Sequence, residues 1–159
     1  MRLYLIRHAS AVPSGTPGIP DDERPLTPRG EKRWTRAARG LARILKRPDA
    51  LLSSPLPRAW RTAEIAATAW GRVDAEPAEA LADGDFEAWG ALLVGYGQDA
   101  RVALVGHEPH LSVLLARLVG GNAARMAFKK GGVAVVDLTG PLSGGGTLVA
   151  MLPPGLLRK

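Results

Sequence analysis

Short apolar runs recur along the chain and predict the strands of a sheet. They cover residues 3–6, 50–52, 102–105, 133–136 and 147–152. The first, third and fourth runs are continuous rather than alternating, which is typical of strands that are buried on both faces of a parallel sheet.

A long helix is predicted from residue 28 to about residue 45. Thr27 offers a side-chain cap, and Pro28 fits the first helical position. Apolar residues then repeat at helical spacing and form one face, made of Trp34, Ala37, Ala38, Leu41 and Leu45. The opposite face carries a basic stripe of Arg29, Arg33, Arg36, Arg43 and Arg47. Such a stripe is most often a solvated surface, and the alternative is a docking face for an acidic partner.

Further helices are predicted over residues 57–70 and 85–94, and from residue 109 to the two glycines at 120 and 121, which favour a helix end. Strands that alternate with helices in this order predict an α/β fold, a three-layer α/β/α sandwich around a mainly parallel sheet. Residues 143–146 form a predicted turn between the last two runs, which should therefore pair as an antiparallel edge. Trp34 and Trp60 are expected in the core, because both lie at core spacing on their helices.

The composition is that of an ordinary globular protein. The 159 residues are 46% hydrophobic and 23% charged, and this length predicts a single domain over residues 1–159. Because the chain has no cysteine, disulfides, thiolate metal sites and thiol catalysis are excluded. No apolar run approaches the ~20 residues of a membrane span. The first run is short and is followed at once by Arg7 and His8, unlike a signal peptide, so a cytoplasmic location is predicted.

The chain is strongly basic. Its 21 basic and 15 acidic residues give a net charge of +6, which suits nucleic acid, an acidic protein or a phosphorylated substrate as a partner. Arginines outnumber lysines by 16 to five. The planar guanidinium group favours phosphate, although a GC-rich genome produces the same bias.

Two of the three histidines follow directly after predicted buried strands. His8 and His107 each come two residues after such a run. Arg58 lies in the first turn of the predicted helix that follows the run at residues 50–52. Ligands of open α/β sheets bind outside the carboxyl ends of the strands. These three side chains and Arg7 should therefore converge at one edge of the sheet.

This group of side chains suits phosphoryl transfer. Two guanidinium groups supply forked donors for a phosphoryl group, and the helix that begins at Pro57 adds free N–H groups and the positive end of its dipole. One neutral imidazole could act as a covalent nucleophile, and the other could donate a hydrogen bond to the phosphoryl oxygens. Positioning and charge neutralisation are the main requirements of this reaction, so neither a metal nor another cofactor is expected.

A metal site built on His107 and His110 is not favoured. Their i, i+3 spacing fits a metal pair, but the chain has only three histidines, no cysteine and no HExxH pattern. His110 is instead expected to cap its helix or to pack against it.

Taken together, these segments resemble the histidine phosphatase superfamily, which has the phosphoglycerate mutase-like fold, and most of all its small SixA-type phosphohistidine phosphatases. The resemblance covers nearly the whole chain. The matching stretches are LYLIRHASA at residues 3–11, RPLTPRGEKR at 24–33, SSPLPRAWRTAEI at 53–65, LVGHEPHLS at 104–112 and, more weakly, KKGGVAVVDL at 129–138.

The resemblance implies a role for each matching residue. His8 corresponds to the nucleophile that becomes phosphorylated. Arg7 and Arg58 correspond to the phosphate-binding arginines, and His107 to the second histidine of the phosphate pocket. Ser14, six residues after His8, stands where larger members often place a polar phosphate contact.

Two positions depart from the family pattern. The usual Arg-His-Gly is Arg-His-Ala here, and Ala9 is harmless only if its backbone avoids positive φ. Larger members carry an acidic general acid shortly after the third strand, where Asp83 fits the spacing best and Asp85 is second, while both residues also fit a turn. A phosphohistidine substrate has less need of an acid, because imidazole leaves more readily than an alkoxide.

The resulting expectation is a metal-independent phosphatase that acts through a phosphohistidine enzyme intermediate. Phosphohistidine on a protein partner is the first candidate substrate, because the chain has little room for the inserted lids of larger relatives. A small phosphorylated metabolite, such as a sugar phosphate or a nucleotide, is the second. A non-catalytic phosphate-binding or nucleic-acid-binding module comes last, since no aromatic or Gly-basic nucleic-acid motif is present. No specific nucleic acid and no membrane are expected as partners.

Overall fold

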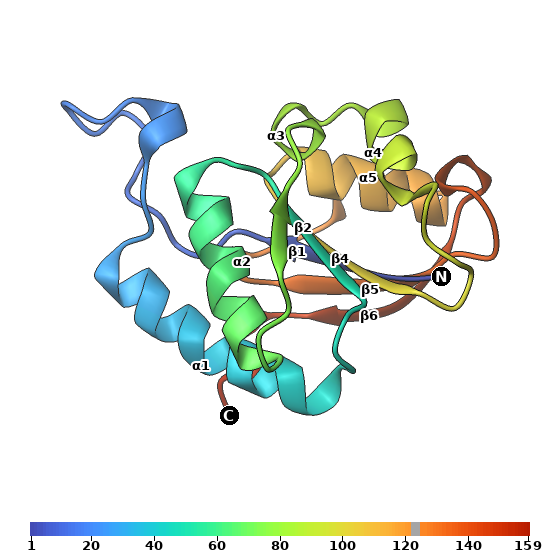
Figure 1. Ribbon diagram of the computed structural model, residues 1–159. Coiled ribbons are helices and arrows are strands. Elements are labelled where there is room, and N and C mark those ends of the chain that lie inside the picture. The colour runs from blue at the N-terminus through green and yellow to red at the C-terminus, as the bar shows by residue number, and fades with distance from the viewer. Residues whose placement is uncertain (122–124) are drawn as a thin grey trace.

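The computed structural model describes residues 1–121 and 125–159. Helices and strands alternate along most of the chain (Figure 1). In the element names below, η stands for a 3-10 helix. The elements in chain order are β1 (Arg2–Arg7), η1 (Asp21–Glu23), α1 (Pro28–Ile44), β2 (Ala50–Ser53), α2 (Pro57–Ala69), β3 (Ala75–Pro77), α3 (Ala80–Asp83), α4 (Phe86–Leu93), β4 (Arg101–Gly106), α5 (His110–Val119), β5 (Val133–Asp137), η3 (Leu142–Gly144), β6 (Thr147–Leu152) and α6 (Pro154–Leu157).

The strands form one sheet in the order β3-β2-β4-β1-β5-β6. β3, β2, β4 and β1 are parallel, whereas β5 runs antiparallel to both β1 and β6. The predicted mainly parallel sheet with an antiparallel edge is confirmed. β1 pairs with β4 on one side and with β5 on the other, and its residues 3–6 are all buried. This burial explains why the apolar run is continuous.

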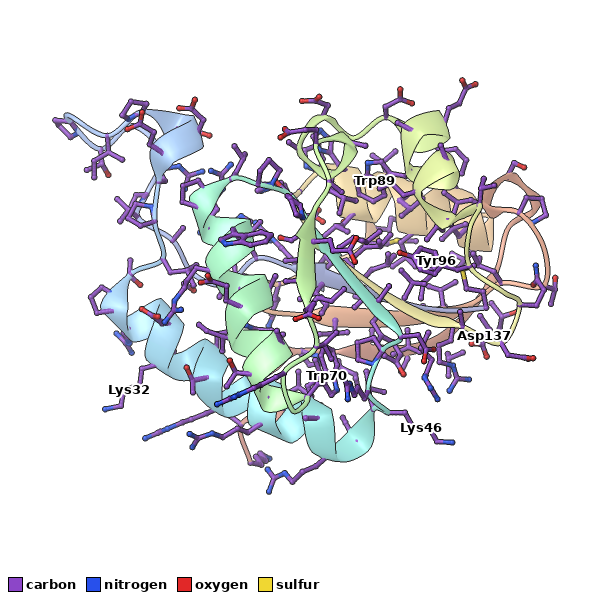
Figure 2. The ribbon with its side chains drawn as sticks, in the orientation of Figure 1. Lys32, Lys46, Trp70, Trp89, Tyr96 and Asp137 are labelled. Atoms are coloured by element: carbon purple, nitrogen blue, oxygen red, sulfur yellow. The ribbon has the colours of Figure 1, made fainter. Side chains whose placement is uncertain are left out.

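Helices cover both faces of the sheet and give the predicted three layers (Figure 1). α1, α2 and α6 share one core with one side of the sheet, and α3, α4 and α5 share a second core with the other side. Alternate residues of β1 supply the two cores. Tyr4 stacks on Trp70 with ring centroids 6.0 Å apart, whereas Leu5 lies in the core of Trp89. Trp70 and Trp89 lie on opposite sides of the strands in Figure 2.

The first turn of α1 forms where the sequence predicted it and is fixed against the end of β1. The Thr27 hydroxyl accepts a hydrogen bond from the Gly30 N–H at 2.9 Å, and Pro28 occupies the first turn. Gly30 touches the backbone carbonyl of Ser10 so closely that any Cβ atom would overlap it. The segment that follows His8 is therefore held in place by the packing of α1.

Five short elements were not expected from the sequence, namely β3, α3, α6 and the 3-10 helices η1 and η3. β3 has three residues, two of them exposed, and pairs only with β2 at the edge of the sheet. α3 and α6 have four residues each. Elements this short do not complete an apolar repeat, so hydrophobic periodicity cannot reveal them.

Two finer expectations need correction. Trp60 is only half-buried and belongs to neither core, because the buried face of α2 is built largely from small residues, including Ala59, Ala63 and Ala66. The connection between β5 and β6 is also longer than the predicted turn at 143–146, because it includes the 3-10 helix η3. Among the described residues, no helix is both long enough and apolar enough to cross a membrane, and the cytoplasmic location stays a prediction.

Candidate active site

The carboxyl ends of β1 and β4 bring two histidines together. These strands pair in parallel with Arg7 opposite Gly106, and the His8 backbone N–H donates to the Gly106 carbonyl at 3.0 Å. The rings of His8 and His107 follow directly, with centroids 5.2 Å apart and planes tilted by 51°. Both side chains are buried, so the two imidazoles share one protected site.

The backbone fixes the tautomer of His8. Its Nδ1 lies 2.7 Å from the Ala9 carbonyl oxygen, which can only accept, so Nδ1 carries the proton and Nε2 keeps its lone pair. The Ala9 N–H donates to the Thr62 hydroxyl at 3.0 Å, and that hydroxyl donates to the Arg58 carbonyl at 2.7 Å. Ala9 does not adopt a positive φ, so its replacement of the usual glycine causes no backbone strain.

His107 is oriented by a serine at the end of β2. His107 Nε2 lies 2.8 Å from the Ser54 hydroxyl oxygen, and that oxygen accepts a hydrogen bond from the Leu56 N–H at 3.3 Å. Among the described residues this hydroxyl has no other acceptor, so it donates its proton to Nε2 and the imidazole proton is left on Nδ1. The Nδ1–H is buried without a partner, which makes it available to an acceptor in the site.

Each arginine is anchored through one side of its guanidinium group. Arg7 Nη1 donates to the Phe128 carbonyl at 2.6 Å. Arg58 Nη1 donates to the Asp21 carbonyl at 2.8 Å, and its Nη2 lies 3.7 Å from the Asp21 carboxylate. Burial lowers the pKa of both arginines from its ordinary value, because each charged group has lost part of its hydration. A bound anion could replace the lost hydration.

The site holds a set of hydrogen-bond donors that lack acceptors. Within the described part of the chain, three of the five buried side-chain nitrogens without a partner are Arg7 Nε, Arg58 Nε and His107 Nδ1. A buried polar group without a partner costs about 1–3 kcal/mol. A phosphoryl group offers several negatively charged oxygens to these donors, so its binding would satisfy them.

Burial keeps both histidines neutral over a wide pH range. The pKa of His8 is lowered to about 4, mainly by burial and to a smaller extent by the charges of Arg58, Arg7 and Lys130, against the opposing effect of the hydrogen bond to Ala9. The pKa of His107 falls to about 3, again mainly through burial. A neutral His8 with a free Nε2 lone pair is the form that a covalent nucleophile requires.

The structure does not join the other predicted residues to this group. Ser14 is exposed and donates to the Asp21 carboxylate at 2.6 Å, so its contact with phosphate stays a prediction. Asp83 is exposed at the end of α3, and among the described residues its carboxylate forms no hydrogen bond or ion pair. Asp85 caps α4 by accepting from the backbone N–H of Glu87 and Ala88, which accounts for it structurally. His110 begins α5 and its ring packs against Gly84.

Three contributing residues were missed by the sequence reasoning. Ser54 orients His107, Thr62 supports the backbone of Ala9, and Asp21 reaches Arg58 from the 3-10 helix η1, about 40 residues earlier in the chain. The stretch at residues 53–65 contains the first two, but only the three-dimensional contacts reveal what they do. Among residues 1–121 and 125–159, no three His, Asp or Glu side chains gather closely enough to hold a metal ion.

Comparison with known proteins identifies this α/β protein as a phosphatase and supplies its family. A family model of the histidine phosphatase superfamily (branch 1) matches residues 3–95. A protein of uncharacterised function from Picosynechococcus sp. is 33% identical over 138 residues, which are 84% of this chain and 82% of that protein. The chain belongs to the histidine phosphatase superfamily.

Solved structures confirm the similarity to the SixA-type branch. The structure of the protein histidine phosphatase SixA in complex with tungstate matches with a TM-score of 0.81 at 28% identity, covering 99% of both chains. A phosphoserine phosphatase from Entamoeba histolytica, in complex with 3-phosphoglyceric acid, matches with a TM-score of 0.69 at 16% identity, covering 98% of both chains. The latter similarity concerns the fold alone.

Proposed function

We propose that this phosphatase hydrolyses phosphohistidine on a protein partner through a phosphorylated His8. The observation that carries the proposal is the state of the His8 ring, whose Nδ1–H is held by the Ala9 carbonyl at 2.7 Å. Nε2 is then free to attack phosphorus beside the three unpartnered donors. Arg7 and Arg58 bind the phosphoryl oxygens, and His107 donates its Nδ1–H to one of them.

The reaction has two displacement steps. In the first, His8 Nε2 forms a bond to phosphorus while the bond between phosphorus and the substrate nitrogen breaks, and the substrate leaves as neutral imidazole if its ring already holds a proton. In the second, water attacks phosphorus, the bond to Nε2 breaks, and inorganic phosphate leaves. The arginines neutralise charge on the equatorial oxygens in both steps. No metal takes part in this scheme.

Three observations favour phosphohistidine on a protein over a phosphate ester. An imidazole leaving group has little need of a general acid, and the candidate acid Asp83 is exposed and has no hydrogen bond to the site. The chain is also basic, with a net charge of +6, and the solved relative SixA is a protein histidine phosphatase. Residues 1–159 are taken as one catalytic domain, because both cores are built on the same sheet.

A small phosphorylated metabolite is the second candidate. The phosphoserine phosphatase of the same fold was solved in complex with a small molecule, 3-phosphoglyceric acid, and Arg7, Arg58 and His107 would serve a phosphate ester equally well. In that case Asp83 is the proposed proton donor to the leaving alkoxide, and Ser14 a further phosphate contact after rearrangement of its loop.

A substrate panel separates these candidates. We would compare kcat/KM for a histidine-phosphorylated protein domain, phosphoimidazole, p-nitrophenyl phosphate, sugar phosphates and nucleotides. The proposal predicts that the phosphorylated domain is hydrolysed with the highest kcat/KM and that a His8→Ala variant hydrolyses none of them. A higher kcat/KM for a sugar phosphate or a nucleotide would favour the second candidate. Binding without any hydrolysis would indicate a phosphate-binding or nucleic-acid-binding module.

A further inference from the structure

A small basic pocket lies directly beside the phosphoryl site. It has a volume of about 170 Å³ and is bounded by the first turns of α1, the segment before β5, and α6. Ala9, Trp34 and Pro154 supply apolar parts of its lining. A methylene group could contact these surfaces while a charged end faced the rim.

Every charged residue at the rim of the pocket is basic. Arg33, Lys129, Lys130 and Arg158 line it, and no carboxylate does. All four side chains belong to exposed residues. Among the described residues, none of the four forms an ion pair with an acidic side chain. The pocket therefore presents uncompensated positive charge around a cavity the size of one side chain.

The pocket and the phosphoryl site share a wall. Ala9 lines the pocket and also holds the His8 ring through its carbonyl. Gly131 lines the pocket as well, and its N–H donates to the carbonyls of Arg7 and His8 at 3.1 Å. The charge of Lys130 reaches His8 strongly enough to lower its pKa. A group in the pocket would therefore lie against the backbone that holds His8.

We propose that this pocket binds a carboxylate side chain of the protein substrate, close in space to its phosphohistidine. The inference rests on the proposed function and adds a specificity site to it. The volume suits an aspartate or glutamate side chain, and the basic rim would pair with its carboxylate.

The surroundings favour a protein as the source of this carboxylate. Basic residues continue from the pocket along the outer face of α1 towards the C-terminus, where Arg36, Arg39, Arg43 and Arg158 line a broad open depression. A small metabolite would leave this surface unused, whereas an acidic protein surface would complement it. The carboxylate in the pocket would fix the direction from which the phosphohistidine approaches His8.

The test uses synthetic phosphohistidine peptides in matched pairs. One peptide carries glutamate on both sides of the phosphohistidine and the other carries glutamine, so that the pair differs in charge and hardly in shape. Each kcat/KM is divided by that for phosphoimidazole, which has no second anionic group. This division removes any effect of a variant on the phosphoryl site itself.

The expected result is a preference of about 5- to 10-fold for the glutamate peptide in the wild-type protein, the size of a favourable pair assisted by neighbouring charges. Arg33→Glu should abolish or reverse this preference, and Arg33→Lys should retain most of it. Lys46→Glu is the matched control, because it makes the same change in charge far from the pocket. Lys46 lies just after the end of α1, opposite to the end that carries Arg33, and extends into solvent (Figure 2). The control should keep the wild-type preference.

Several results would overturn the pocket proposal. They are equal kcat/KM for the two peptides in the wild type, loss of the preference in Lys46→Glu as large as in Arg33→Glu, or an unchanged preference in Arg33→Glu. A small substrate with a carboxylate, such as 3-phosphoglycerate, could instead have a higher kcat/KM than both peptides and lose it in Arg33→Glu. That result would show that the carboxylate in the pocket comes from a small molecule and not from a protein. If neither phosphoimidazole nor the two peptides are hydrolysed, the proposed phosphohistidine phosphatase function is wrong. This result differs from hydrolysis without a preference between the peptides, which contradicts the pocket proposal alone.

Discussion

The Ser54 hydroxyl links the end of β2 to the second histidine of the site, with its oxygen 2.8 Å from His107 Nε2. Both residues are buried, so water cannot easily replace this contact. The Ser54 oxygen accepts from the Leu56 N–H, and among the described residues His107 Nε2 is the one acceptor in reach of the hydroxyl proton, which is therefore directed at the imidazole. A residue that touches no substrate in the proposed mechanism thus decides which nitrogen of His107 can donate.

Removing this hydroxyl should weaken catalysis through His107. In Ser54→Ala either nitrogen of the ring can hold the proton, so the donor at Nδ1 is present only part of the time. We expect kcat to fall by about 5- to 10-fold, which corresponds to about 1 kcal/mol for one hydrogen bond. The same substitution in a His107→Ala background should cause little further loss, as a double-mutant cycle would measure. An equal loss in both backgrounds would mean that Ser54 acts on the fold and not on His107.

The two arginines should contribute strongly and separately to turnover. Arg7→Ala and Arg58→Ala each remove preorganised donors whose Nε atoms are buried and unpartnered. Loss of one such donor to a transition state typically costs about 3–4 kcal/mol, or 100- to 1000-fold in kcat. Arg61→Ala is a control on the same helix, because Arg61 is half-exposed and pairs with Glu31 and Glu64. Near-normal rates in either site variant would remove that arginine from the proposed mechanism.

Much of the fold could be predicted because its signals are local. The continuous runs at 3–6 and 102–105 indicate buried strands, and Thr27 with Pro28 marks the start of α1. β3 escaped prediction because it is too short for a periodic pattern and takes its conformation from pairing with β2. Trp60 was misplaced because helical spacing alone does not say which of two adjacent faces meets the sheet.

The same limit applies to the site. The strand-end position of His8 and His107 follows from the order of the runs, and it brought both into consideration. The contact of Asp21 with Arg58 depends on how the loop before α1 folds back over α2, and no spacing in the sequence encodes that. Burial lowers the pKa of His8 more than the neighbouring arginines do, and the sequence pattern does not show how deeply the ring is buried.

The general acid can be identified by comparing leaving groups. If Asp83 protonates an alkoxide, Asp83→Asn should reduce hydrolysis of alkyl phosphates by about 10²- to 10⁴-fold and hydrolysis of phosphohistidine far less. Asp21→Asn is the comparison variant, since Asp21 is also exposed but lies against Arg58. Equal losses on both substrates in Asp83→Asn would indicate a positioning role, and no loss on either would leave proton donation to solvent.

The buried histidines should make the fold sensitive to mild acid. Folding lowers the pKa of His8 from 6.5 to about 4 and that of His107 from 6.5 to about 3. Below pH 6.5 the unfolded chain therefore takes up protons that the folded protein does not, and the free energy of unfolding falls as pH decreases. Between pH 7 and pH 5 each histidine should remove about 1–2 kcal/mol.

Urea unfolding at these two pH values measures this effect. His8→Gln and His107→Gln each remove one titrating group, so each variant should lose less stability than the wild type between pH 7 and pH 5. Val94→Gln is a control, because Val94 is highly exposed. An equal drop in the wild type and both histidine variants would show that His8 and His107 titrate normally in the folded protein.

The covalent intermediate is the most direct test of the proposed mechanism. Attack through His8 Nε2 requires Nδ1 to keep its proton, as the hydrogen bond to the Ala9 carbonyl ensures. Rapid acid-free quenching with labelled phosphohistidine substrate should therefore trap phosphate on His8 as a phosphoramidate, which is stable in base and labile in acid. Turnover and labelling should both survive treatment with a chelator, because the arginines, and no metal, neutralise the phosphoryl charge.

Variants identify the residue that carries the label and distinguish the roles of the two histidines. His8→Ala should abolish both labelling and turnover, whereas His107→Ala should slow labelling without removing its site. Because burial holds the pKa of His8 at about 4, labelling should stay efficient at pH 5.5, where an ordinary histidine would be mostly protonated. Label on a serine or an aspartate, or continued turnover in His8→Ala, would contradict the assignment of His8 as nucleophile. Loss of labelling at pH 5.5 that follows an apparent pKa near 6.5 would show instead that His8 is solvated during catalysis.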